Sequence, residues 1–221
     1  MSEKSVIVFL GPSLDLETAR SILLSADYRP PASRGDLEKA AREGPDIICL
    51  IDGVFFEQCS VGHREILGAL KQGISVIGAS SMGALRASET ESFGMIGIGQ
   101  VFELYKNKIV ESDDEVAVIC DPRTNEALSE ALVNIRATIE KAVDESVLSA
   151  EEGILFLETA AGIYYPDRIY DHFIDLLKNE TACLDSVSKF EEWILNGNAK
   201  DIKKEDAISA LKYVQTLILE K

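Results

Sequence analysis

The chain has 221 residues, enough for one large domain or for a domain with an appendage. Its 38 acidic and 22 basic residues give a formal net charge of −16, which argues against nonspecific nucleic-acid binding and against anionic membrane surfaces. We see no secretory signal and no apolar run of roughly 18 residues, so we expect a cytoplasmic protein without a membrane span. The four cysteines show no metal-ligand spacing, and we expect neither a metal nor a cofactor.

Short apolar runs alternate with helix-like segments in the first half of the chain. The runs expected to form strands are Val6–Leu10, Asp46–Gly53, Ser75–Ala79 and Val116–Cys120. From Asn125 a 3.6-residue periodicity replaces them. We therefore expect an α/β protein, with a parallel-sheet core over residues 1–124 and a helical region over residues 125–221.

The first two strands are each followed by a loop with functional potential. Gly11-Pro12-Ser13 predicts either a turn capped by Ser13 or a weak anion-binding loop, because Pro12 removes one N–H donor. Asp52 follows the second strand, where open α/β sheets place their ligand sites. It could orient a catalytic base, bind an N–H group, or cap the next turn.

A stiff basic connector, Tyr28–Asp36, lies between these two loops. Its two prolines fix an extended path from which Arg29 and Arg34 project. The two guanidinium groups either bind a carboxylate or phosphate or are simply solvated. Asp36 is expected to cap a short helix over residues 37–43.

The third strand leads into a sharp turn at Ser80-Ser81 and a helix. Gly78-Ala-Ser-Ser-Met82 matches the G-x-S-x-G nucleophile elbow except for its last glycine. The N–H groups of Met82 and Gly83 are expected to be unpaired and to receive an anion. A serine here is either a nucleophile or a helix cap. His63, which opens the preceding helix, is either a general base or a structural residue.

Two segments after this turn are less distinctive. Three glycines within Phe93–Gln100 predict a mobile or tightly turned loop. Ser112-Asp-Asp-Glu115 is an acidic cluster that favours turn capping over metal binding. In the helical half, Leu128, Leu132, Ile135 and Ile139 predict one helix face, and Ser149-Ala-Glu-Glu152 predicts a capping box.

Several of these segments together resemble the TfuA-like family. The matching segments, which span roughly residues 6–140 in order, are Phe9–Ser13, Tyr28–Asp36, Ile51–Gly53, His63–Leu67, Gly78–Ala87, Asp113–Ala117, Ser129-Glu130 and Val133–Arg136. The resemblance implies a partner of YcaO proteins in peptide-backbone thioamidation. It implies that the chain hydrolyses a thiocarboxylated, ThiS-like sulfur carrier and so delivers sulfide to YcaO. The archaeal branch implies a glycine of the McrA subunit of methyl-coenzyme M reductase as the target.

The resemblance also implies a hydrolase site with a Ser–Lys pair. Ser81 is the expected nucleophile and Ser80 the alternate. Many relatives have lysine where this chain has Arg64, and arginine cannot act as a general base. The base is therefore Lys71, Lys106 or Lys108, or else His63. The residues expected to bind substrate or partners are Arg29, Arg34, Asp36, Asp52, Arg64, Glu65, Met82, Gly83, Arg86, Asp113, Asp114, Asn134 and Arg136.

Two further functions stay open on sequence alone. The chain could be a non-catalytic adaptor that recruits the carrier, YcaO and the substrate peptide. Less strongly, the Gly11-Pro12-Ser13 loop suggests an anion- or nucleotide-binding α/β module.

Overall fold

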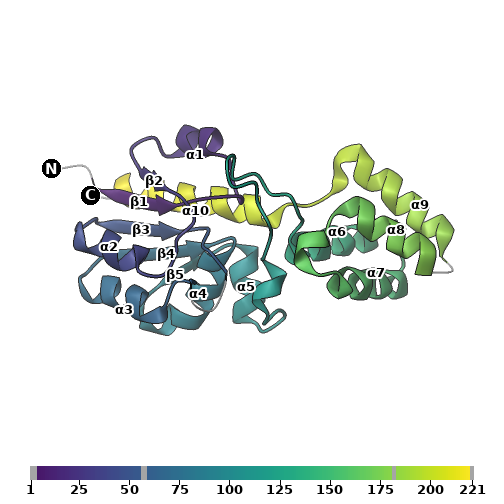
Figure 1. Ribbon diagram of the computed structural model, residues 1–221, viewed down its shortest axis with the longest axis horizontal. Helices are drawn as coiled ribbons and strands as arrows, with labels where there is room; N and C mark the ends of the chain where they lie inside the picture. Colours follow the sequence, from purple (N-terminus) through teal and green to yellow (C-terminus); the bar gives the residue numbers. More distant parts are fainter. Residues whose placement is uncertain (1–3, 56–58, 181–182, 220–221) are drawn as a thin grey trace. The chain divides into compact units, whose positions relative to one another are not determined.

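The computed structural model describes residues 4–55, 59–180 and 183–219, and the chain divides into two compact units (Figure 1). The sheet unit comprises Met1–Asp113 and Lys203–Lys221, and the helical unit comprises Asp114–Ile202. The sequence pattern instead predicts a boundary after residue 124, with residues 125–221 in the helical region. The last helix belongs to the sheet unit because its apolar residues, such as Leu211 and Val214, share a core cluster with the strands.

The sheet unit contains five parallel strands in the order β2-β1-β3-β4-β5. They are β1 (Val6–Phe9), β2 (Asp27–Arg29), β3 (Ile47–Leu50), β4 (Ser75–Ala79) and β5 (Ile96–Ile98). All residues of β1 and β3 are buried. Continuous apolar runs of this kind are typical of parallel strands that are covered on both faces. The predicted α/β class is confirmed.

Helices cover both faces of this sheet (Figure 1). The helices of the sheet unit are α1 (Leu16–Ile22), α2 (Asp36–Arg42), α3 (His63–Lys71), α4 (Met82–Thr90), α5 (Gln100–Lys106) and nearly all of α10 (Ile202–Leu219), with the 3₁₀ turn η1 (Glu91–Phe93). The core against α1 and α10 is formed by alternate strand residues, among them Val8, Cys49 and Ile77. On the opposite face, α4 packs closely against β4.

Two predicted elements are wrong, one at the edge of the sheet and one in the helical unit. The glycine-rich segment expected to be a loop contains β5, whose Gly97 pairs with Gly78 of β4. A Cβ atom on Gly97 would lie 2.2 Å from the Phe102 ring, so glycine lets α5 cover this strand. The strand expected at 116–120 is absent, and Cys120 makes only an isolated bridge to Ala127.

The helical unit is built around three phenylalanines. Its helices are α6 (Leu132–Asp144), α7 (Ala150–Gly162), α8 (Tyr170–Glu180) and α9 (Leu184–Trp193), with short turns η2 (Asp113–Glu115, which begins at the boundary), η3 (Tyr165–Asp167) and η4 (Ile194–Asn198). Phe156, Phe173 and Phe190 are fully buried and make edge-to-face contacts, with ring centroids 5.4–6.4 Å apart. The predicted capping box of Ser149 and Glu152 is confirmed. Leu128 lies outside α6 and is exposed.

Within the part of the chain that the structure describes, none of the helices has the length and apolar composition of a membrane-spanning segment.

The close approach of α4 to the sheet depends on two glycines. A Cβ atom on Gly83 would lie 1.8 Å from the carbonyl oxygen of Leu50, and one on Gly78 would lie 2.2 Å from the carbonyl oxygen of Gly83. Both clashes are with backbone atoms, which cannot rotate away. Only glycine therefore allows the first turn of α4 to rest directly on β3 and β4.

We predict that Gly83→Ala lowers the free energy of unfolding by about 3 kcal/mol or more, because backbone atoms have to separate to admit the methyl group. Gly68→Ala is the matched control, since Gly68 lies within α3 and a Cβ atom there meets nothing within 4 Å. That control should gain roughly 0.5–1 kcal/mol from better helix propensity. Urea unfolding and amide exchange of the β4 residues measure both effects. Equal stability of the two variants would contradict the packing argument.

Candidate functional site

The carboxyl ends of β1, β3 and β4 bring three loops together at one edge of the sheet. The strand order is that of open α/β sheets whose ligands bind where the connections switch direction, here between β1 and β3. The side chain of Asp52 reaches the Gly11–Ser13 loop, and the Gly83 N–H donates to the carbonyl of Ile51. The expected convergence of the three loops is therefore confirmed.

Asp52 holds the first of these loops in place. Its buried carboxylate accepts hydrogen bonds from the N–H groups of Gly11 (2.8 Å) and Ser13 (3.2 Å). It also accepts one from the Ser13 hydroxyl at 2.6 Å. Ser13 is thus tied to Asp52, and Asp15 is the N-cap of α1. Of the three roles considered for Asp52, the structure shows N–H binding.

Ser80 occupies the sharp turn between β4 and α4. Its φ of 68° is positive, a conformation that non-glycine residues seldom adopt. The Ser81 N–H donates to the carbonyl of Ala79 at 2.7 Å, which closes a three-residue γ-turn of the rare positive-φ form around Ser80. Such backbone strain clusters at functional sites.

The hydroxyl of Ser80 is buried, and among the described residues it has no hydrogen-bond partner. A buried hydroxyl without a partner costs stability, so its retention calls for an explanation. Ser80 also stands in the serine register of the G-x-S-x-G pattern, two residues after Gly78. Ser81 is the N-cap residue of α4, yet its side chain makes no capping bond. The geometry thus favours Ser80 over Ser81 as nucleophile.

The expected anion site on Met82 and Gly83 is only partly present. The Gly83 N–H donates to the Ile51 carbonyl at 3.2 Å, and the Ser81 N–H is used in the γ-turn. The Met82 N–H has no acceptor within the described part of the chain. Gly83 is therefore a packing residue and not, as expected, an N–H donor to an anion. The Met82 N–H remains a candidate donor at the positive, amino-terminal end of α4.

The arginines expected to bind an anion are mostly held by other groups. Arg29 contacts Asp27 (2.7 Å) and Glu43 (2.6 Å), and these hydrogen bonds raise its pKa further. Arg86 donates to the carbonyl of Val61 and pairs with a glutamate of α4, each at 2.7 Å.

Arg34 and Arg64 differ from these two. Arg34 donates from Nε to the carbonyl of Ser60 at 3.3 Å. Arg64 is exposed, and no partner is found for it in the described ranges.

Asp36 and Glu65 order the loop between β2 and α2. Asp36 accepts from the Ser33 N–H at 2.9 Å and pairs with Lys39 at the same distance. Glu65 accepts from the N–H groups of Gly62 (2.9 Å) and Gly35 (2.7 Å), and so joins this loop to the start of α3. These two acids thus shape the edge of the site through backbone contacts.

His63 is not brought to the serines. Its Nε2 lies 2.8 Å from Glu89, and its side chain is 53% exposed. Glu89 lies eight residues beyond Ser81, about 12 Å along α4 at 1.5 Å per residue. This arrangement favours a structural contact between His63 and Glu89 over the role of general base.

Among the described residues, none of the expected lysines makes a hydrogen bond or ion pair with the turn. Lys71 ends α3, just before the amino end of β4, whereas Ser80 follows the carboxyl end, about 16 Å away at 3.3 Å per residue. Lys106 ends α5 and pairs with Glu91 at 2.8 Å. Lys108 follows α5 with a φ of 57°.

Sequence reasoning missed a buried lysine, Lys203, near the carboxyl ends of the strands, where the Ser80 turn also lies. The Asp206 carboxylate of α10 accepts from the N–H groups of Gln100 and Val101, both at 2.8 Å, directly after β5. Burial raises the pKa of Asp206 to about 6, and these two bonds oppose the shift. The start of α10, with Lys203 only 4% exposed, therefore lies at the carboxyl edge of the sheet. No sequence signal shows that α10 returns to this edge.

The remaining candidates belong to ion pairs and hydrogen bonds within the helical unit. Arg136 pairs with Glu115 at 2.7 Å, and the Asn134 amide donates to Glu130 and Asp201, each at 2.9 Å.

Asp114 of the same unit pairs at 2.6 Å with Arg168, a fully buried arginine that sequence reasoning missed. Asp113 is an exposed residue at the end of the sheet unit. Within the described residues, no three His, Cys, Asp or Glu side chains are grouped to hold a metal.

Comparison with known proteins adds one positive result. A protein-family model described as TfuA-like protein matches residues 52–169, which is just over half of the chain. The match includes Asp52 and the Ser80 turn and extends through Asp114, Asn134 and Arg168. A search of curated proteins found no match.

We predict that Asp52→Ala lowers the free energy of unfolding by about 2–4 kcal/mol, because three donors lose a charged acceptor. Ser13→Ala removes one of the three bonds and should cost about 1 kcal/mol. Urea unfolding gives both values, and amide exchange should show faster opening at Gly11 and Ser13 in Asp52→Ala. An unchanged exchange rate at these two amides would show that Asp52 does not hold the loop.

Proposed function

The chain belongs to the TfuA-like family, which is associated with YcaO proteins and with thioamidation, and from this premise we propose that it is a serine hydrolase that releases sulfide from a protein thiocarboxylate. The proposed substrate is the C-terminal thiocarboxylate of a ThiS-like, ubiquitin-fold carrier. The sulfide would serve a YcaO enzyme, with a glycine of McrA as the target.

The observation that carries the proposal is the Ser80 turn. A strained serine between a buried strand and a helix, with a hydroxyl that has no partner among the described residues, is the arrangement of a nucleophile elbow. Asp52 accepts three hydrogen bonds and so holds the Gly11–Ser13 loop, which lies beside the turn, in a fixed position. These features support Ser80, rather than Ser81, as the attacking residue.

In the first step, the Ser80 oxygen attacks the thiocarboxylate carbon. A base takes the hydroxyl proton, and the negative charge that develops on the carbonyl oxygen faces the Met82 N–H. The C–S bond then breaks with its electron pair on sulfur. The base passes the proton to that sulfur, which leaves as hydrosulfide. The carrier tail remains on Ser80 as an ester.

In the second step, water attacks the ester and restores Ser80. The carrier leaves with an ordinary carboxylate, and one proton is released. Hydrosulfide is a good leaving group, so a single N–H donor and a modest base suffice. Release of sulfide beside YcaO then matters more than the rate itself.

We propose Lys203 as the base. It is buried at the start of α10, at the same sheet edge as Ser80, whereas Lys71 lies near the opposite edge. A base on α10 also explains why the family pattern can lose its lysine at Arg64 without losing the chemistry. Arg64, an exposed guanidinium at the start of α3, is then free to contact the acidic carrier tail or YcaO.

One observation favours a second function, a non-catalytic adaptor. Ser80 is 0% exposed and Ser81 2% exposed, so a carrier tail reaches them only when covering residues move aside. If that opening does not occur, the turn is a structural element. The chain would then recruit the carrier, YcaO and the substrate peptide without reacting.

We predict that Ser80→Gly lowers the rate of sulfide release from thiocarboxylated carrier about 100-fold or more, measured in the absence of YcaO. Glycine keeps the positive φ without strain, so the variant should fold. Ser81→Ala is the matched control and should retain activity within about threefold. The reverse result would assign the nucleophile to Ser81. If the wild-type chain binds carrier but releases no sulfide, the adaptor function is correct.

We predict that Lys203→Met lowers kcat about 100-fold or more, as loss of a general base does. Lys204→Met is the control, because Lys204 is the adjacent residue and is exposed. Single-turnover release of sulfide from thiocarboxylated carrier measures the chemical step in both variants. If Lys203→Met and Lys204→Met release sulfide equally fast, Lys203 is not the base.

A further inference from the structure

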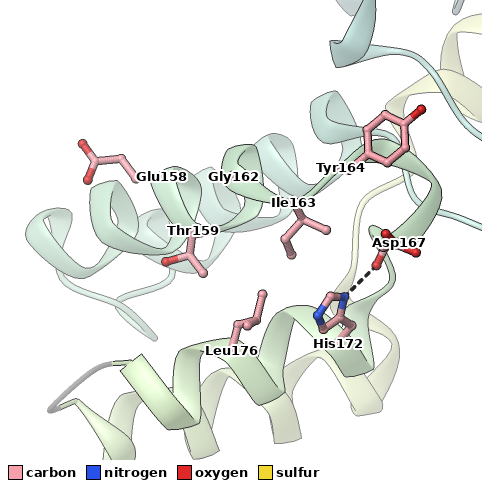
Figure 2. A pocket seen from close by; sticks show the side chains of 8 residues that line it. All are labelled: Glu158, Thr159, Gly162, Ile163, Tyr164, Asp167, His172 and Leu176. Carbon is pink, nitrogen blue, oxygen red and sulfur yellow. Dashed lines mark hydrogen bonds between the residues drawn. The ribbon is translucent and has the colours of Figure 1, made fainter.

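The helical unit contains a cavity between α7 and α8, and the residues that line it all belong to this unit. Its volume is about 390 Å³, within the range of ligand sites. Figure 2 shows Thr159 of α7 and Ile163, which directly follows α7, facing Leu176 and His172 of α8. Ile163 and Leu176 give the cavity an apolar floor.

Hydrogen-bond acceptors dominate the polar lining of this cavity. The Nδ1 atom of His172 lies 2.9 Å from the Asp167 carbonyl oxygen. A carbonyl only accepts, so Nδ1 carries the proton, and in the neutral ring Nε2 is an acceptor. The Thr159 hydroxyl donates to the Leu155 carbonyl at 3.0 Å, which leaves its lone pairs for a ligand.

Two carboxylates and an aromatic ring stand at the rim. Glu158 lies at one end of the cavity and Asp167 at the other, with Tyr164 beside Asp167 (Figure 2). Neither carboxylate has a cationic partner in the described part of the chain, and no lysine or arginine lines the cavity. Tyr164 is 66% exposed, so its ring face can receive a cation.

The distribution of charge over the chain also points to a positively charged ligand. Residues 114–202 contain 19 acidic and only 7 basic residues, so the helical unit carries most of the chain's formal net charge of −16. The resulting negative potential attracts basic chains and repels acidic ones. It acts independently of the shape of the cavity.

We propose that the cavity between α7 and α8 binds a basic peptide segment of a partner protein, with lysine or arginine side chains placed at Glu158 and Asp167. The aliphatic stems of these side chains lie on Ile163 and Leu176, and their N–H groups donate to the carboxylates and to His172. An extended peptide suits the site because it can run from one end of the cavity to the other, with alternate side chains on the same side.

The probe is a capped peptide with lysine at alternate positions, titrated into the isotopically labelled full chain and followed by amide NMR shifts. We expect shifts that concentrate in residues 158–176. Replacing the lysines with norleucine, which keeps the stems and removes the charge, should weaken binding about tenfold. Equal binding of the norleucine peptide would overturn the proposal.

A double variant tests the two carboxylates. Glu158→Gln with Asp167→Asn should weaken binding about tenfold, while Glu151→Gln with Asp175→Asn should leave it within about twofold. The control pair removes the same charge from exposed positions of α7 and α8 that lie outside the cavity. Equal losses in both variants would show general charge attraction only. Spermidine that binds as tightly as the peptide would identify a free polyamine and overturn the assignment to a partner protein.

Discussion

The contact on which the site depends is the one between α4 and the backbone of β3 and β4. Gly83 lies against the Leu50 carbonyl and Gly78 lies under the Gly83 carbonyl, so the helix begins directly on the sheet. The chain then has only two residues, Ser80 and Ser81, in which to pass from strand to helix, and Ser80 makes the sharp turn. That constraint forces the positive φ and the γ-turn, and it leaves the Ser80 hydroxyl buried without a partner among the described residues.

The same contact decides which N–H groups remain for a substrate. Because Gly83 is so close to β3, its N–H donates to the Ile51 carbonyl, and the γ-turn uses the N–H of Ser81. Met82 is left as the donor that faces no acceptor among the described residues. A site with one backbone donor suits a substrate whose leaving group departs easily. This is consistent with the proposed thiocarboxylate and less so with an ordinary amide.

The sequence correctly predicts those features of the fold that depend on local residue patterns. The strands at Val6, Ile47 and Ser75, the convergence of their loops and the Ser149 capping box follow from periodicity and from residue type. The predictions from sequence are wrong or incomplete where packing between distant segments determines the structure. Gly97 forms an edge strand only because Phe102 covers it. Lys203 reaches the site edge only because α10 returns to the sheet, which no local signal records.

The two units differ in charge in a way that separates their proposed tasks. The sheet unit holds 19 acidic and 15 basic residues, and the helical unit holds 19 and 7. A thiocarboxylate is an anion, so the proposed hydrolysis suits the more nearly neutral unit, where Arg64 and the start of α4 can attract it. The proposed basic peptide suits the unit in which acidic residues are in excess. One chain can therefore hold an anionic carrier tail and a basic segment at once, because the charges that attract each are carried by different units.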